Sequence, residues 1–186
     1  VVEHHVCRRE TSTPGRQNHA DRAPEHPMTD TSTAVVAHLD TPLHEFTRDR
    51  YVISTDRKRL DIDFIHRSLT HCPWSEGISR DKVERSIHTS YCFGVYDGDT
   101  QVGFSRVITD FVTFAYVGDF FITESHRGHG LGKWLISTIL ECPELAGLQR
   151  KCIVTAEAHG LYREMGFMSV QRPAAYLEVI NKDAYR

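Results

Sequence analysis

The sequence lacks both a long hydrophobic run and a paired-cysteine motif. No stretch approaches the ~20 apolar residues that a membrane-spanning helix needs, and the first ten residues hold no apolar segment typical of a secretory signal. The five cysteines are odd in number and no two form a CxxC pair. We therefore expect neither a disulfide framework nor a metal site. Reduced thiols favour a cytoplasmic location.

An excess of positive charge is also missing. The chain carries 22 Lys and Arg against 25 Asp and Glu, for a formal net charge of -3. Neither a nucleic-acid partner nor binding to a membrane surface is predicted from this balance. With 186 residues, of which 40% are apolar and 25% charged, the chain suits one globular domain with its own core, plus a tail.

Hydrophobic periodicity is nearly absent from residues 1–48, which hold four prolines and six of the twelve histidines. This composition predicts a disordered or loosely docked arm over residues 1–48 and a globular domain over residues 49–186. The spacing of the histidines matches no metal site, so a solvated tail is favoured. Met28 is a hypothetical start of translation, with the preceding residues as an upstream extension.

The pattern of apolar residues changes repeatedly from residue 51 onwards. Alternating or continuous apolar runs predict strands over residues 51–54, 91–96, 101–109, 114–123, 151–156, 167–170 and 175–180. Helical spacing predicts helices over residues 60–70, 80–89, 131–141 and 159–165. This order predicts an α+β fold with a mixed, mostly antiparallel sheet flanked by helices.

A glycine-rich segment joins a strand to an amphipathic helix; it reads Arg127-Gly128-His129-Gly130-Leu131-Gly132-Lys133. Free amides and the dipole at a helix N-terminus attract anions, and glycines let a phosphate approach the backbone. A nucleotide P-loop is disfavoured, because Arg127 stands at its first glycine and Trp134 at its hydroxyl residue. A dinucleotide fingerprint fails as well, because Lys133 or Leu135 stands at its third glycine.

The pattern Arg-x-x-Gly-x-Gly instead resembles the coenzyme A loop of the GNAT superfamily of acyl-CoA N-acyltransferases. A second segment, Leu161-Tyr162-Arg163-Glu164-Met165-Gly166-Phe167, is similar to the Leu-Tyr-x-x-x-Gly-Phe signature of the same family. It follows the first motif after one predicted strand, as in the family. The resemblance covers residues 50–180 and implies a GNAT-like acyl-CoA N-acyltransferase fold.

The resemblance implies acetyl-CoA (coenzyme A) as the cofactor and the transfer of its acetyl group to a primary amine. The strand before the loop is expected to bulge and to diverge from its neighbour, so that backbone groups of residues 121–123 meet the pantetheine arm. The implied cofactor-binding residues are Phe121, Ile122, Thr123, Arg127, Gly128, His129, Gly130, Leu131, Gly132, Lys133, His159 and Tyr162.

Two residues are predicted to be catalytic. In the family, the tyrosine that matches Tyr162 often acts as the general acid to the departing CoA thiolate; a packing role is the alternative. Asp119 lies in an apolar run, where a carboxylate costs several kcal/mol unless it is paired. It is predicted to be either the general base or a structural partner of a backbone amide or an arginine. Glu124, Glu157 or a chain of waters could replace it as the base.

The amine acceptor is the least determined part of the prediction. A small-molecule amine is favoured, and a protein amine or a non-catalytic acyl-CoA sensor of the same fold are the alternatives; the presence of Tyr162 favours an enzyme. Relatives in the family often dimerise, so a homodimer is expected by analogy. Residues that could line the acceptor site are His66, His71, Trp74, Glu76, Phe93 and Arg106.

Overall fold

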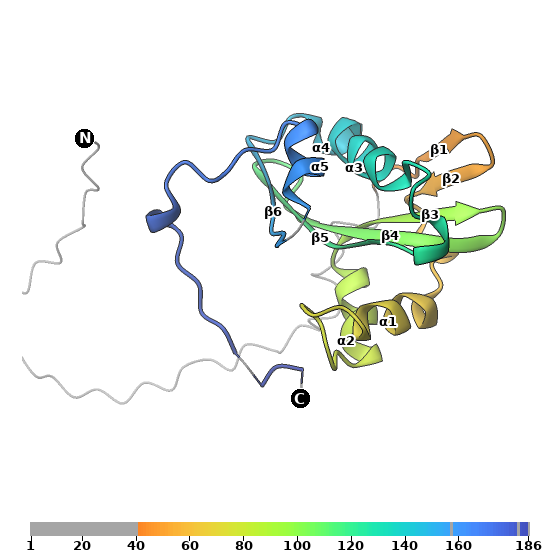
Figure 1. The fold of residues 1–186 in the computed structure, drawn as a ribbon, viewed down its shortest axis with the longest axis horizontal. Coiled ribbons are helices and arrows are strands. Elements are labelled where there is room, and N and C mark those ends of the chain that lie inside the picture. Colours follow the sequence, from red (N-terminus) through yellow and green to blue (C-terminus); the bar gives the residue numbers. More distant parts are fainter. Residues whose placement is uncertain (1–40, 157, 182, 186) are drawn as a thin grey trace, which may run out of the picture. The chain divides into compact units, whose positions relative to one another are not determined.

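The computed structural model describes residues 41–156, 158–181 and 183–185. Its centre is a six-stranded sheet with the strand order β1-β2-β3-β4-β5-β6 (Figure 1). Each of the first five strands is antiparallel to its neighbour, and β6 is parallel to β5. The mixed, mostly antiparallel sheet is therefore confirmed. The strands are β1 (Glu45–Arg48), β2 (Tyr51–Ser54), β3 (Tyr91–Asp97), β4 (Thr100–Thr109), β5 (Phe114–Ile122) and β6 (Arg150–Ile153).

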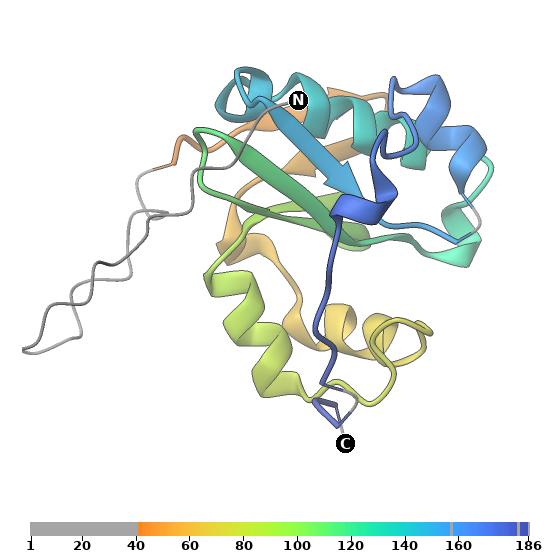
Figure 2. The same cartoon turned by 90° about the vertical axis from the view of Figure 1, so that its left-hand side faces the viewer.

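Helices cover both faces of the sheet (Figures 1 and 2). One face carries α1 (Ile62–Thr70) and α2 (Arg80–His88), and the other carries α3 (Leu131–Glu141), α4 (Pro143–Ala146) and α5 (His159–Glu164). The helix α4 was not predicted. Pro143 ends α3 as expected, but it also begins this short helix, because proline is well tolerated in a first helical turn.

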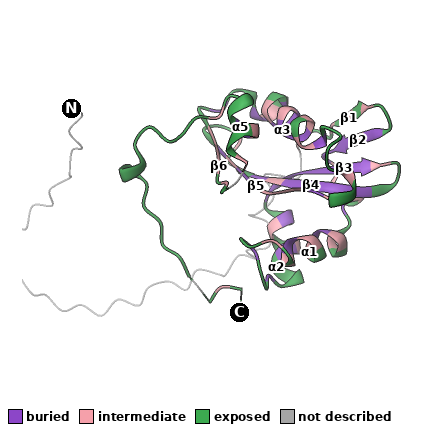
Figure 3. Ribbon diagram, in the orientation of Figure 1, coloured by how far each residue is buried: buried purple, intermediate pink, exposed green. Residues whose placement is uncertain are grey.

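Buried side chains form a separate core on each face of the sheet (Figure 3). On the α1–α2 side, Ile65 and Leu69 of α1 pack with Phe104 of β4. On the α3 side, Leu135 and Ile139 pack with the inward side chains of the central strands. Both cores follow from the helical spacing of apolar residues in the sequence. None of the helices in the described residues is long and apolar enough to cross a membrane.

The first hairpin corrects the predicted boundary of the N-terminal arm. β1 lies within residues 1–48 but pairs with β2 from Glu45↔Ser54 to Arg48↔Tyr51. A two-residue turn joins the strands, and Asp49 adopts a positive φ of 54° there. The pairing partner, rather than the local composition, makes this segment a strand. Residues 1–40, including Met28, lie outside the described residues.

The end of the chain also differs from the prediction. The strands expected over residues 167–170 and 175–180 do not form; a 3₁₀ turn, η4 (Pro173–Ala175), stands between them instead. Leu177 and Val179 are 96% and 101% exposed. Pro173 has no N–H to donate, and alternation of apolar residues cannot hold a strand that lacks a paired neighbour. The remaining predicted strands and helices are confirmed, with ends shifted by a few residues.

Candidate functional site

A bulge interrupts β5 shortly before its end. β4 pairs with β5 at Phe104↔Phe121 and at Arg106↔Gly118, so two residues of β5 lie opposite one residue of β4. One of the two, Asp119, has a φ of 50°. The pairing of β5 with β6 stops at Val117↔Ile153. The last part of β5 therefore has no strand partner on its β6 side among the described residues, which leaves backbone groups available there.

The glycine-rich loop follows β5 through a 3₁₀ turn, η3 (Glu124–His126), and ends where α3 begins. Gly128 and Gly130 have φ values of 81° and 71°, which side chains rarely allow. The first hydrogen bond of α3 runs from the Trp134 N–H to the Gly130 carbonyl at 3.0 Å. The amides of residues 131–133 come before that bond, so they can donate to an anion. Arg127 Nε donates to the Ile122 carbonyl at 3.2 Å and so holds the loop against β5.

A pocket of about 480 Å³ joins this loop to the end of β5 and to the segment that follows α1. Two of its lining residues, Cys72 and Trp74, come from that segment. Thr123, His129, His159 and Tyr162, which were also expected to bind the cofactor, do not line it. The predicted residues that do line the pocket are Phe121, Ile122, Arg127, Gly128, Gly130, Leu131, Gly132 and Lys133.

Tyr162 of α5 does not line this pocket, but it contacts a residue that does. Its ring packs edge-on against Phe120, which lines the pocket, with 6.0 Å between the centroids, and against Phe167 at 5.7 Å. Burial raises the pKa of Tyr162 to about 12. Within the described part of the chain, no group forms a hydrogen bond with its hydroxyl. The phenol is therefore protonated at neutral pH and has its proton available.

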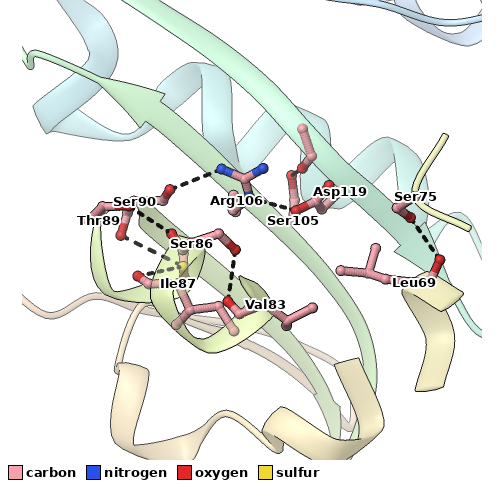
Figure 4. A network of polar contacts seen from close by, with 12 residues as sticks. Leu69, Ser75, Val83, Ser86, Ile87, Thr89, Ser90, Ser105, Arg106 and Asp119 are labelled. Atoms are coloured by element: carbon pink, nitrogen blue, oxygen red, sulfur yellow. Dashed lines mark hydrogen bonds and ion pairs between the residues drawn. The ribbon is translucent and has the colours of Figure 1, made fainter. Parts of the chain in front are cut away.

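Asp119 has a charged partner on the α1–α2 side of the sheet (Figure 4). Arg106 Nε lies 2.5 Å from its carboxylate, and the Arg106 Nη1 donates to Ser90 Oγ at 3.3 Å. The side chains of Arg106 and Asp119 are only 18% and 13% exposed. Ser105 Oγ also donates to the Gly118 carbonyl at 3.1 Å, next to the bulge. This ion pair supports the structural interpretation of Asp119; a catalytic role stays a prediction.

The residues suggested for the acceptor site are dispersed. Phe93 is fully buried in the core, and Glu76 is exposed. His66 and His71 contact the backbone carbonyls of nearby residues at 3.0 and 2.6 Å. Trp74, 58% exposed, is the member of the group that lines the pocket. Of the other suggested bases, Glu124 is exposed at the start of η3, and Glu157 lies outside the described residues.

Sequence reasoning missed Arg48, which β1 places against the loop. Its guanidinium donates to the carbonyls of His129 at 3.2 Å and Gly130 at 3.5 Å. The same group lies 4.6 Å from the ring centre of Trp134 in α3. Arg48 and His129 are 81 positions apart, and Arg48 had been assigned to the arm. No local signal could have linked it to the loop.

His126, which also lines the pocket, was missed as well. Its Nδ1 lies 3.0 Å from Thr123 Oγ1 and 2.9 Å from Ser125 Oγ. Its Nε2 lies 3.5 Å from a carboxylate oxygen of Asp97, at the end of β3. These contacts fasten the turn between β5 and the loop to the neighbouring hairpin.

Comparisons with known proteins show what the chain is similar to. The model of the acetyltransferase (GNAT) family matches residues 60–167, which include the bulge, the loop and Tyr162. A candidate acetyltransferase of Gibberella zeae is 31% identical over 145 residues, 66% of this chain and 81% of that protein. A candidate GNAT acetyltransferase from Xanthomonas campestris superposes with a TM-score of 0.71 at 39% identity, over 75% of this chain and 99% of that one.

A more distant structure shares the fold. It is a predicted acetyltransferase from Clostridium acetobutylicum, crystallised with acetyl-CoA, and it superposes with a TM-score of 0.52 at 14% identity. The superposition covers 70% of this chain and 94% of that one.

Proposed function

Because the chain belongs to the acetyltransferase (GNAT) family, we propose that it transfers the acetyl group of acetyl-CoA to a primary amine of a small molecule. The observation that carries this proposal is the pocket that connects the glycine-rich loop to the free edge of β5. In this proposal the loop binds the cofactor, the edge of β5 holds its thioester, and Tyr162 protonates the departing thiolate. Acetyl-CoA supplies the activated acyl group.

The loop would hold the pyrophosphate of acetyl-CoA. The amides of residues 131–133 point out of the first turn of α3, and the positive φ values of Gly128 and Gly130 keep the backbone open to a phosphate. Lys133 adds positive charge beside them, although Glu164 of α5 pairs with it at 2.5 Å. Arg48 would act as a positioning residue, since it binds two loop carbonyls and so holds the loop in shape.

The backbone of residues 121–123 would hold the pantetheine arm and polarise the thioester carbonyl. β6 does not pair with this part of β5, so the edge of the strand is open to a ligand there. Some of its backbone groups are already bonded: the Ile122 carbonyl accepts from Arg127 Nε, and the Thr123 N–H donates to the Val102 carbonyl. Fixed backbone dipoles stabilise a developing oxyanion without having to reorganise. The bulge at Asp119 turns the strand just before this segment.

Tyr162 would donate its proton to the sulfur of the departing thiolate. Burial holds the phenol neutral, because it raises the pKa of Tyr162 to about 12. The contact with Phe120 places the ring beside the pocket. The amine must lose a proton as well. Because Asp119 is paired with Arg106, solvent is the proposed acceptor of that proton, and Asp119 is the alternative base.

The pocket volume of about 480 Å³ falls within the range of ~300–1,000 Å³ that is usual for small-molecule sites. Because the loop and strand that line this pocket are assigned to acetyl-CoA, the volume describes the donor part of the site, and the screen of amines decides whether the acceptor is small. A protein amine is the second candidate acceptor, and the exposed Trp74 at the pocket is the feature that would favour it. The alternative in which the protein is not an enzyme is a non-catalytic sensor of acyl-CoA.

Isothermal titration with acetyl-CoA, with ATP and NAD as controls, tests the donor. We expect micromolar binding of acetyl-CoA alone. A screen of amines that follows the release of the CoA thiol then tests the reaction. Equal or absent binding of the three ligands would contradict the proposal. Tight binding without turnover on small amines or peptides would favour the sensor.

A further inference from the structure

A second cluster of ligating side chains lies where the chain enters β1 and where α3 passes into α4. His44 Nε2 is 2.7 Å from one carboxylate oxygen of Glu144, and Cys142 Sγ is 3.1 Å from the other. The three ligating atoms all lie within 4.8 Å of one another. None of these residues lines the pocket of the candidate acyl-transfer site. We propose that His44, Cys142 and Glu144 form a binding site for Zn²⁺.

The backbone holds all three side chains in place. The His44 N–H donates to Thr55 Oγ1 at 2.8 Å, and the Thr55 N–H donates back to the His44 carbonyl at 3.0 Å. Cys142 is both the C-cap residue of α3 and the N-cap residue of α4. Glu144 follows in the first turn of α4. The ligands thus come from a strand entry and a helix junction, which position them better than a free loop would.

The ligand set suits zinc. Nitrogen, sulfur and oxygen bind Zn²⁺ at about 2.0–2.3 Å, so tetrahedral ligands lie about 3.3–3.8 Å apart. The observed 2.7 and 3.1 Å are shorter, as expected where protons hold the side chains together through hydrogen bonds. Small side-chain movements would admit the ion. Three protein ligands leave the fourth position to water.

The charges balance on binding. Zn²⁺ bonds to Sγ of Cys142 and the thiol proton leaves to solvent. Nε2 of a neutral His44 bonds as well, with its ring proton on Nδ1, and one carboxylate oxygen of Glu144 completes the set. A thiolate and a carboxylate together neutralise the ion, which lowers the cost of burying it. The Tyr91 hydroxyl, 3.5 Å from Sγ, can support the sulfur from outside the ligand set.

The ion can reach this site from solvent. Cys142 is fully buried, but the side chains of His44 and Glu144 are 26% and 15% exposed. Bound zinc would tie the entry of β1 to the α3–α4 junction, across 100 positions of sequence. Because β1 also carries Arg48, the ion would steady the strand that contacts the acyl-CoA loop.

Metal titration of the full chain, first stripped with a chelator, tests the site. We expect one Zn²⁺ per chain by equilibrium dialysis, and a thiolate-to-cobalt charge-transfer band on titration with Co²⁺. Cys142→Ser should abolish the band, and His44→Gln should weaken zinc binding by at least the ~100-fold that losses around a metal site reach. The matched controls Cys152→Ser and His71→Gln should bind zinc as the wild type does.

Two outcomes would overturn the inference. The first is zinc binding that is as tight in Cys142→Ser as in the wild type, together with no thiolate-to-cobalt band in the wild type, which would assign the ion to other histidines of the chain. The second is no zinc binding at all. If circular dichroism shows that Cys142→Ser does not fold, Glu144→Gln decides, because it keeps the shape of the side chain while removing its charge. Zinc binding by Glu144→Gln as tight as by the wild type would then refute the site.

Discussion

The two sides of the candidate pocket differ in whether backbone groups or side chains form their surface. On the α3 side, backbone amides, two glycines with positive φ and a helix N-terminus form the surface. On the α1–α2 side, side chains do so, with Cys72 and Trp74 at the pocket and the Arg106–Asp119 ion pair behind it. A backbone site needs only a short local motif and recurs across a family. A side-chain site depends on each residue, so the family does not reveal the acceptor.

Among the substitutions considered, Gly132→Asp on the α3 side of the pocket should cause the largest loss of acetyl-CoA affinity. An added Cβ meets nothing closer than a Phe120 ring atom at 3.9 Å, so the fold should tolerate the change. A carboxylate about 4 Å from a phosphate costs about 4 kcal/mol at an effective dielectric constant of 20, or roughly a thousandfold in affinity. Titration with acetyl-CoA measures it, with Gly132→Ala as the control that keeps binding. Unchanged affinity in the Asp variant would remove the loop from the donor site.

Tyr162→Phe should lower kcat by roughly a hundredfold, the scale of general acid catalysis. Acetyl-CoA affinity and thermal stability should change little, since none of the described groups bonds to the hydroxyl. Steady-state kinetics and thermal unfolding measure the two effects, and Tyr176→Phe in the exposed C-terminal segment is the control. Full activity of Tyr162→Phe across the pH range would show that the residue only packs.

The substitution Asp119→Asn tests the α1–α2 side of the pocket. Asparagine tolerates the positive φ of 50°, but it leaves Arg106 without its charged partner. Unfolding free energy should fall by about 1.5–3 kcal/mol, the value of a hydrogen bond to a charged group. The pH profile of kcat/KM should keep its shape. If the kcat/KM of Asp119→Asn no longer rose with pH as that of the wild type does, Asp119 would instead be the base. Asp63→Asn, in the more exposed pair with Arg80, is the control.

Arg48→Lys should have the smallest effect. Lysine keeps the charge but loses the planar group that bonds two carbonyls and stacks on Trp134. An exposed contact of this kind contributes about 0.5–1 kcal/mol, so the Kd for acetyl-CoA should rise two- to fivefold. Arg50→Lys on the same hairpin should leave the Kd unchanged. A change as large as that of Gly132→Asp would mean that Arg48 itself binds the phosphates.

Sequence patterns predicted those parts of the site that depend on neighbours along the chain. The glycine-rich loop and α3 were found together, because a glycine motif and helical spacing are both local signals. The predictions that were wrong concern segments whose structure depends on pairing with another strand. β1 became a strand through β2, and the alternation in residues 175–180 produced none without a paired neighbour. Asp119 stood out as a buried carboxylate, but its partner Arg106 could not be chosen from the sequence.

The sequence by itself determined the α+β fold, the family and the position of the loop, because these follow from periodicity and from short motifs. Only the tertiary structure decided which distant side chains meet. It placed Arg48 on the loop, Phe120 against Tyr162, and His44 beside Glu144 across 100 positions of the chain. Such contacts leave no local pattern, because they arise where the packing of the sheet and its helices brings separate segments within bonding distance.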